Sequence, residues 1–425
     1  MQHFTSFYLT RDLARISCKI VLSFGVLSFL FFQLTGNKTI RSENQFFLAK
    51  SIETGRSERF TDGFQSLALP DTGLPHVHAG TLVETPEGLR AFWYSGTREG
   101  AKDVAIYSAF MTWSLADWLP PKVVMTRERL QQDLHRSIKK LGNAVPFITQ
   151  SGELALYFVS VSIGGWAGSA LNVMVSADHG ETWGAAQRLV TSPFWNISTL
   201  VKETPFMWAN GDIGLPAYHE FMGKFGEIVR INPAGQVVAK QRLESGRHSI
   251  QPSLMIHDPQ HADVYLRYAG AEQRRIYKTR TQDGGQTWSE AQAMDLPNPN
   301  AAVASVKLSS QEGGQEGLLV YNRDENFRHI LSLAWQAEAE APWLLLCDLE
   351  SGGQAQRFSY PHMIQDRLGV VHLVYTDDRA VIRHIRFTPE WLAERVQAAT
   401  PNLDRQTSES KLAPNPVPRC GGGRV

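Results

Sequence analysis

The chain has 425 residues, and its 42 lysines and arginines balance its 42 aspartates and glutamates, so the formal net charge is zero. This balance argues against a general nucleic-acid binder, which needs a surplus of positive charge to neutralise phosphates. A composition of 43% hydrophobic and 20% charged residues is ordinary for a globular protein and excludes a mainly disordered one. Three cysteines, Cys18, Cys347 and Cys420, are too few for a disulfide framework or for a cysteine-based structural zinc site.

The N-terminal segment, residues 1–35, is predicted to be a signal peptide or a membrane anchor. Basic residues, the last of them Lys19, precede an apolar run over residues 20–32. A positive flank before a short apolar stretch is typical of a secretory signal, and it would carry the following chain across the membrane. No small-residue cleavage site follows, which favours an uncleaved anchor over a cleaved signal or a buried helix of a cytosolic protein. We therefore expect an extracytoplasmic protein, periplasmic or secreted, held in the inner membrane by this segment if it is not cleaved.

Residues 65–397 are predicted to form one large domain of β-strands, after a polar linker over residues 36–64. Short alternating or apolar runs bounded by turn residues recur along it; four of them are residues 154–162, 264–268, 317–321 and 370–375. Helical periodicity is scarce, and the two candidate helices are residues 126–141 and 389–396. Prolines and a triple glycine predict a disordered tail over residues 398–425.

Two segments repeat one pattern, S/T-x-D-x-G-x-T-W, over residues 176–183 and 281–288. The pattern predicts a tight turn between antiparallel strands. The aspartate can accept hydrogen bonds from nearby amides, the glycine can adopt positive φ, and the tryptophan can pack under the hairpin. We expect this role to be structural, not catalytic.

The spacing of these segments predicts how many such units the chain holds. A hairpin turn without the tryptophan lies midway between them, near residue 236, and further marks occur near residues 118, 343 and 391. Six units of about four strands, at roughly 50–60 residues each, would make an all-β, six-bladed β-propeller. A pair of β-sandwiches and a seven-bladed ring remain alternatives.

The repeated pattern resembles the Asp box, or BNR repeat, of the sialidase (neuraminidase) superfamily. Over residues 70–390 the chain is most similar to the predicted bacterial neuraminidase group of that superfamily. The phrases that carry the resemblance are residues 76–80, 93–103, 215–220, 251–253, 296–300, 319–323, 359–361 and 374–379. The resemblance implies a glycan or polysaccharide as the partner. No histidine pair on a helix suggests zinc and no glycine-rich loop suggests a nucleotide, so we expect no metal and no cofactor.

In this family three arginines hold the substrate carboxylate, a tyrosine activated by a glutamate attacks the anomeric carbon, and an aspartate is the acid/base. Arginine orients an anionic sugar through paired hydrogen bonds, and a neutral tyrosine avoids the repulsion that a carboxylate nucleophile would meet. Position by position, the resemblance implies Arg267 and Arg328 as two of the arginines, Tyr360 as the nucleophile, and Glu99 or Asp103 as the acid/base.

Other residues of the same phrases are predicted to bind the substrate. They are His76, Arg98, Tyr218, His219, Glu220, Gln251, Asn322 and Arg379.

Two departures from the family pattern open a second chemistry. The first family arginine is missing, with His76 and His78 near its place, and Gln251 stands where the glutamate partner of the tyrosine is expected. His78 or Tyr360 could instead abstract a proton beside a carboxylate, with arginines neutralising the developing charge. We therefore expect a sialidase-like exo-glycosidase acting on a terminal acidic sugar. The alternatives are a polysaccharide lyase that cleaves a uronic-acid linkage by β-elimination, and a catalytically inactive glycan-binding propeller.

Overall fold

The computed structural model describes residues 44–48, 63–113, 117–193, 195–243, 246, 248–309, 314–400 and 417–421. The segment predicted to be a signal or anchor, residues 1–35, lies outside these residues. Within the described part of the chain, no helix combines the length and the apolar character that a membrane span requires.

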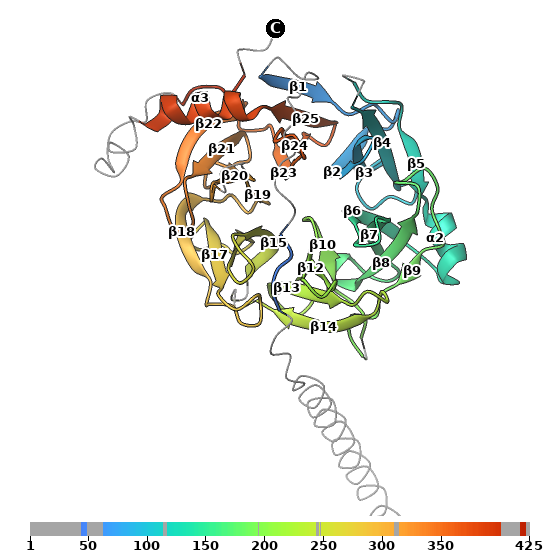
Figure 1. Ribbon diagram of the computed structural model, residues 1–425. Coiled ribbons are helices and arrows are strands. Elements are labelled where there is room, and N and C mark those ends of the chain that lie inside the picture. Colours follow the sequence, from blue (N-terminus) through green and yellow to red (C-terminus); the bar gives the residue numbers. More distant parts are fainter. Residues whose placement is uncertain are drawn as a thin grey trace, which may run out of the picture. The chain divides into compact units, whose positions relative to one another are not determined.

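The described chain is built almost entirely of β-strands, arranged in five sheets (Figure 1). The first sheet holds β2 (His76–Thr85), β3 (Gly88–Gly96), β4 (Ala105–Thr112) and β5 (Lys122–Met125). The second holds β6 (Lys140–Ile148), β7 (Leu154–Val161), β8 (Ser169–Ser176) and β9 (Gln187–Arg188).

The third sheet has nine strands in two halves. One half contains β10 (Leu200–Val201), β11 (Phe206–Met207), β12 (Ile213–His219), β13 (Lys224–Ile231) and β14 (Val237–Arg242). The other contains β15 (His248–Ile256), β16 (Ala262–Tyr268), β17 (Arg275–Thr281) and β18 (Gln292–Pro297). A short parallel pairing of Lys224 and Phe225 with His248 and Ser249 joins the two halves.

The fourth sheet holds β19 (Ala304–Lys307), β20 (Gly317–Asn322), β21 (Ile330–Gln336) and β22 (Leu344–Ser351). The fifth holds β23 (Phe358–Gln365), β24 (Val371–Asp377), β25 (Val381–Phe387) and β1 (Phe64–Ala68). The helical elements are α2 (Arg127–Leu134), the single 3₁₀ turn η1 (Trp166–Gly168) and α3 (Pro389–Ala399).

Successive sheets, and the two halves of the third sheet, also pack against one another through strands near their starts. β2 contacts β6, β6 contacts β10, β12 contacts β15, β15 contacts β19, and β19 contacts β23. β23 in turn contacts β2, so the first and the last sheets are neighbours (Figure 1). The buried apolar clusters lie between such neighbours; one, for example, unites Leu82 and Trp93 with Val374 and Ile382. Strands such as β7 and β20 therefore bury both faces, which explains why their runs are almost continuously apolar.

The strand predictions are confirmed, whereas one helix is shorter than predicted. The predicted runs correspond to β7, β16, β20 and β24, and the predicted helix near residue 389 is α3. The helix predicted over residues 126–141 is wrong beyond residue 134. Thr126 caps α2 by accepting a hydrogen bond from the Arg129 amide, and His135, with φ of 47°, ends the helix. The chain then enters β6, where Leu141 is buried between sheets, so tertiary packing overrides the helical pattern.

Both repeated turns have the predicted geometry. Asp178 Oδ1 accepts from the Thr182 amide at 2.8 Å, and Asp283 Oδ1 accepts from the Thr287 amide at 2.9 Å. In each turn the glycine has positive φ and donates its amide hydrogen to the first hydroxyl of the pattern. The side chain of Trp288 is buried. The turns are therefore closed by their own side chains, as expected for a structural role.

The mark near residue 391 is not a hairpin of the same kind. Trp391 lies in α3, and the strand beside β25 is β1, which comes from the other end of the domain. Phe64 pairs with Phe387 and Ala68 pairs with Arg383 in this antiparallel ladder. No local sequence pattern predicts a pairing between segments so far apart, because the hydrogen bonds between β1 and β25 form only when the domain has packed.

The predicted linker and tail are wrong in part. Phe46 is 2% exposed and packs on Phe206 and Trp208, so residues 44–48 belong to the folded body. Near the other end, Cys420 forms a disulfide with Cys347 in β22, and residues 417–421 pair with that strand. Hydrophobic burial and a covalent link thus order segments whose composition is polar.

The disulfide should contribute substantially to stability, because it closes a loop of 73 residues. Chain-entropy arguments assign about 4 kcal/mol to a loop of this size. We expect Cys347→Ser to lower the unfolding free energy by roughly 2–4 kcal/mol, as measured by urea denaturation. A reducing agent should destabilise the wild type and leave the variant unchanged; equal sensitivity of both proteins would contradict the link.

Three buried histidines should make the fold sensitive to acid. Burial, and then the charges of nearby basic groups, lower the pKa of His78 and His384 well below 6.5 and that of His362 to about 3. At these histidines the unfolded chain therefore binds more protons below pH 6.5. Their contribution to stability is lost as the pH falls through that range. We expect the unfolding free energy to drop by at most about 1.4 kcal/mol per pH unit for each histidine as pH falls below 6.5. Buried Glu203, whose pKa burial raises to about 7, acts in the opposite direction. Urea titrations at pH 7.5 and pH 5.5 therefore compare the wild type with His384→Gln, and the same pH dependence in both proteins would disprove the contribution of that histidine.

Candidate active site

Four strands from different sheets share one irregularity, which directs side chains toward a common cavity. In β2, β6, β15 and β23 the register with the next strand skips two residues; these are 79–80, 142–143, 251–252 and 360–361. Ala79, Gln251 and Tyr360 have φ near +55°, which is uncommon for residues other than glycine. Bulges of this kind bend a strand and re-aim a side chain, and they are frequent beside active sites.

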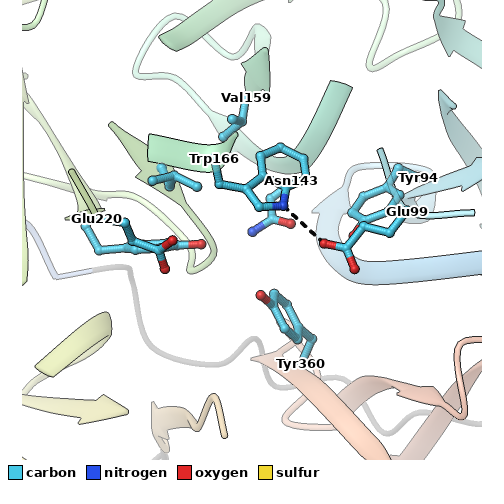
Figure 2. A pocket seen from close by; sticks show the side chains of 9 residues that line it. Tyr94, Glu99, Asn143, Val159, Trp166, Glu220 and Tyr360 are labelled. Carbon is cyan, nitrogen blue, oxygen red and sulfur yellow. Dashed lines mark hydrogen bonds between the residues drawn. The ribbon is translucent and has the colours of Figure 1, made fainter. Parts of the chain in front are cut away.

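The cavity has a volume of ≈ 70 Å³ and is lined by residues from the first three sheets and the last one. The lining residues are Tyr94, Glu99, Asn143, Val159, Trp166, Leu200, Tyr218, Glu220 and Tyr360. Figure 2 shows the phenol of Tyr360 pointing into the space between Glu99 on one side and Glu220 on the other. Four of the predicted residues, Glu99, Tyr218, Glu220 and Tyr360, therefore line one cavity.

Tyr360 is joined to two of the predicted arginines by a chain of hydrogen bonds. The Gln251 side-chain amide donates to the Tyr360 hydroxyl at 3.0 Å and to the Tyr218 hydroxyl at 3.3 Å. Arg267 donates to the Gln251 carbonyl oxygen at 3.0 Å, which fixes the amide so that its NH₂ group faces the two phenols. Arg267 also donates to the Asn300 side chain at 2.7 Å, and Arg328 donates to the Asn300 backbone carbonyl.

His78 lies against the ring of Tyr360, with ring centroids 4.3 Å apart. Its Nδ1 shares a hydrogen bond of 3.1 Å with the Thr376 hydroxyl. Burial lowers the pKa of His78 well below its ordinary value, and the charges of Arg379, His76, Arg328 and Arg267 lower it further. The imidazole is therefore neutral at physiological pH, and its surroundings carry three arginines.

Glu99 occupies the opposite side of the cavity, where it is held by two partners. Its Oε2 pairs with Arg379 at 3.0 Å, and its Oε1 accepts from the Trp166 indole at 3.2 Å (Figure 2). Arg379, with φ of 61°, comes from the turn between β24 and β25, whereas Glu99 follows β3. The ion pair thus spans the first and the last sheets.

His76 and Tyr94 complete this side of the site. The two rings are stacked with centroids 6.4 Å apart, and neither nitrogen of the buried His76 has a hydrogen-bond partner among the described residues. Burial lowers the pKa of His76, and the charge of Arg379 lowers it further. Burial, and then the charge of Glu99, raise the pKa of Tyr94 well above 10. Both groups are therefore neutral near pH 7.

Four predicted residues lie elsewhere. Asp103 accepts two hydrogen bonds from Thr97 and closes the turn between β3 and β4, where Arg98 is exposed. The ring of His219 accepts from the Met222 amide and stacks on Phe225. Asn322 is fully buried and donates to three backbone carbonyls, those of Arg328, Ile330 and Phe358. Their contacts suit a structural role in shaping the loops around the cavity.

Several residues of the site are not among the predicted ones. They are Tyr94, Asn143, Trp166, Lys202 and Asn300. Tyr94 and Asn300 lie inside phrases that carried the family resemblance, so their neighbours were a signal. Asn143 follows a glycine at a bulge, and nothing in the local sequence marks Trp166 or Lys202. In the described part of the chain, no three His, Cys, Asp or Glu side chains gather as a metal would require.

Comparisons with known proteins agree on one family. A family model described as a BNR repeat-like domain matches residues 87–373. No curated protein matches the chain. Three solved structures share the fold at low identity, so the likeness is one of fold alone.

A Hadza microbial sialidase has a TM-score of 0.61 and 13% identity, over 74% of this chain and 66% of its own. NanB sialidase from Streptococcus pneumoniae has a TM-score of 0.61 and 10% identity, over 77% of this chain and 71% of its own. The Trypanosoma rangeli sialidase in complex with sialic acid has a TM-score of 0.59 and 15% identity, over 85% of this chain and 63% of its own. The chain thus spans about two thirds of the length of these proteins. Because the family model covers well over half of the residues, the chain belongs to the BNR repeat-like domain family.

Proposed function

We propose that the protein is a sialidase-like exo-glycosidase that acts on a terminal acidic sugar of a glycan. The observation that carries the proposal is the placement of three arginines around Tyr360. Arg267 donates to the Gln251 side chain, whose amide donates to Tyr360, and Arg328 donates to the neighbouring Ser359 at 3.4 Å. Arg379 pairs with Glu99, which lines the same cavity as Tyr360. Guanidinium groups recognise a carboxylate through paired, charge-assisted hydrogen bonds. Arg267 and Arg328 would hold the carboxylate of the sugar, and Arg379 would take the part of the missing family arginine.

The remaining groups support the chemical step. Once Arg379 binds the substrate carboxylate, Glu99 would take up a proton. It would give this proton to the departing glycosidic oxygen as the Tyr360 oxygen attacks the anomeric carbon. The Gln251 amide donates to the phenolic oxygen, so it stabilises negative charge there. His78 is neutral and adjacent, and it could accept the phenolic proton. Water would then cleave the glycosyl–tyrosine bond, and Glu99 would be the base that deprotonates this water.

We further propose that the sheets form a six-bladed propeller. The nine-stranded sheet would count as two blades, because only a short parallel pairing joins its halves. The contact of β23 with β2 and the pairing of β1 with β25 support a closed ring. A ring would bring the bulges of its inner strands to one end of the central axis, where propellers bind ligands.

A second candidate function, β-elimination from a uronic-acid linkage, is favoured by one specific observation. Among the described residues, the Tyr360 hydroxyl is bonded to the Gln251 amide and to no carboxylate that could accept its proton. A neutral histidine beside a tyrosine could instead abstract the proton next to a carboxylate that the arginines hold. His78 would take the proton from carbon, and a carbon–carbon double bond would form. The glycosidic oxygen would depart with a proton from Tyr360.

One screen of the full chain separates these functions. Sialosides, uronic-acid oligosaccharides and neutral glycans are each incubated with the protein. Hydrolysis is followed by release of the terminal sugar, and elimination by the ultraviolet absorbance of the unsaturated product. We expect release of an acidic sugar without new absorbance. Activity on neutral glycans alone would contradict the arginine argument, and binding without turnover would indicate a catalytically inactive glycan-binding protein.

We also propose that the protein works outside the cytoplasm, with residues 1–35 as its signal or anchor. The disulfide between Cys347 and Cys420 supports this location, because such bonds persist in oxidising compartments. Fractionation of expressing cells tests the location, and recovery with reduced cysteines in the cytosol would contradict it.

A further inference from the structure

Lys202 and Glu203, directly after β10, form an ion pair buried among the inner strands. The Lys202 side chain is 3% exposed and that of Glu203 is 6% exposed. Burying an ammonium group is costly unless its donors are satisfied. Lys202 Nζ donates to the Glu203 carboxylate, to the Val303 carbonyl at 2.8 Å and to the Pro361 carbonyl at 2.5 Å. All three donors of the ammonium are therefore used.

The ammonium lies in the wall of the active site. A second small pocket is lined by Lys202 together with Asn143 and Tyr360, and these last two residues also line the main cavity. Besides its charge, Lys202 contributes hydrogen bonds, and these reach the backbone carbonyls of Val303, next to β19, and of Pro361 in β23.

One of these bonds holds the bulge that presents Tyr360. The Pro361 carbonyl belongs to the two residues that the register of β23 skips, and Tyr360 itself has φ of 55°. A tyrosine stays in this uncommon conformation only where its surroundings enforce it. Thr204 adds a bond of 2.9 Å to Nε2 of His362, whose Nδ1 accepts from the Leu82 amide at 3.3 Å. Residues 202–204 thus fix both residues that follow Tyr360.

We propose that Lys202 is a positioning residue for Tyr360. Its ammonium fixes the Pro361 carbonyl, and through it the direction in which the phenol enters the cavity. The inference rests on the proposed function, in which the Tyr360 oxygen reacts. It assigns Lys202 no contact with the substrate, so loss of Lys202 should slow turnover more than it weakens binding.

The test compares variants that separate positioning from folding. Lys202→Met alone leaves Glu203 buried without its partner, so the main variant combines Lys202→Met with Glu203→Gln. The matched control is Lys240→Met with Glu227→Gln, which removes a buried pair with a 2.9 Å contact between β13 and β14. Displacement of a reacting group by about 1 Å can reduce turnover by about a hundredfold.

We expect the Lys202 double variant to lose roughly 30- to 100-fold in kcat, with KM changed less than threefold. The control pair should keep kcat within about threefold of the wild type, once the folded fraction is corrected for. A Lys202 variant that keeps wild-type kcat per folded molecule would overturn the proposal.

A second readout does not depend on turnover. In protein with selectively labelled tyrosine rings, a nuclear Overhauser effect reports the contact between the rings of His78 and Tyr360. The Tyr360 signal is the one that is lost in Tyr360→Phe. We expect this contact to weaken in the Lys202 double variant and to persist in the control. An unchanged contact would overturn the proposal, whereas a wild type that turns over no acidic sugar would overturn the proposed function alone.

Discussion

Replacing Tyr360 by Phe should abolish turnover and spare binding. The variant keeps the ring that lies against His78 and removes only the hydroxyl that accepts from the Gln251 amide. Without the hydroxyl no covalent bond to the sugar can form, and no proton can be exchanged in an elimination. We expect kcat to fall by at least about a thousandfold, which is roughly 4 kcal/mol in the activation barrier.

The matched control for this variant is Tyr277→Phe. Tyr277 lies in β17, and its hydroxyl donates to Gln273 outside the cavity. The control should retain wild-type kinetics, and both variants should bind an acidic sugar with similar affinity in calorimetry. Substantial turnover by Tyr360→Phe would remove Tyr360 from the chemistry, in hydrolysis and in elimination alike.

Replacing Arg267 by Ala should have the largest effect on binding. The guanidinium is half-buried and donates to Asn300 and to Gln251, whose amide in turn donates to the Tyr360 hydroxyl. Truncating one partner of a desolvated charge pair costs about 2–5 kcal/mol, so we expect KM for an acidic sugar to rise by roughly 30-fold or more. Because Gln251 also loses its anchor, kcat should fall as well.

The specificity of this effect is tested with the ligand and with a second arginine. A neutral analogue of the sugar, without the carboxylate, should bind wild type and Arg267→Ala equally weakly. Arg275→Ala removes an arginine that pairs with Glu325, and it should leave KM unchanged. An equal loss for the charged and the neutral ligand would show that Arg267 acts on structure and not on the carboxylate.

Much of the site was predictable, because its residues lie in short sequence patterns that follow one another along the chain in the same order as in the family. Arg267, Arg328, Tyr360, Gln251 and Glu99 were predicted from phrases of the sequence. In the structure Glu99 and Tyr360 line one cavity, and hydrogen bonds link Tyr360 through Gln251 to Arg267. Asp103 was predicted for the same reason, and the structure uses it to close a turn instead. A carboxylate that follows a strand has the same sequence pattern whether it acts as an acid/base or closes a turn. Only the folded loop distinguishes these two roles.

The missed residues depend on contacts between distant segments. Lys202 bonds to a carbonyl 159 positions away, and Trp166 reaches Glu99 across 67 positions. Neither residue has a neighbour pattern that predicts its partner, since the partner is selected by the packing of one sheet on another.

Local sequence patterns were sufficient to predict the alternation of strands and turns, the side-chain-closed hairpins and the order of the candidate residues. These properties follow from hydrogen bonds and burial within a few residues, which local composition encodes. Contacts between distant segments were needed to reveal that β1 completes the last sheet, that Cys420 reaches Cys347, and that Arg379 pairs with Glu99. Such pairings join residues that are remote in the chain, so their free energy exists only when the sheets have packed.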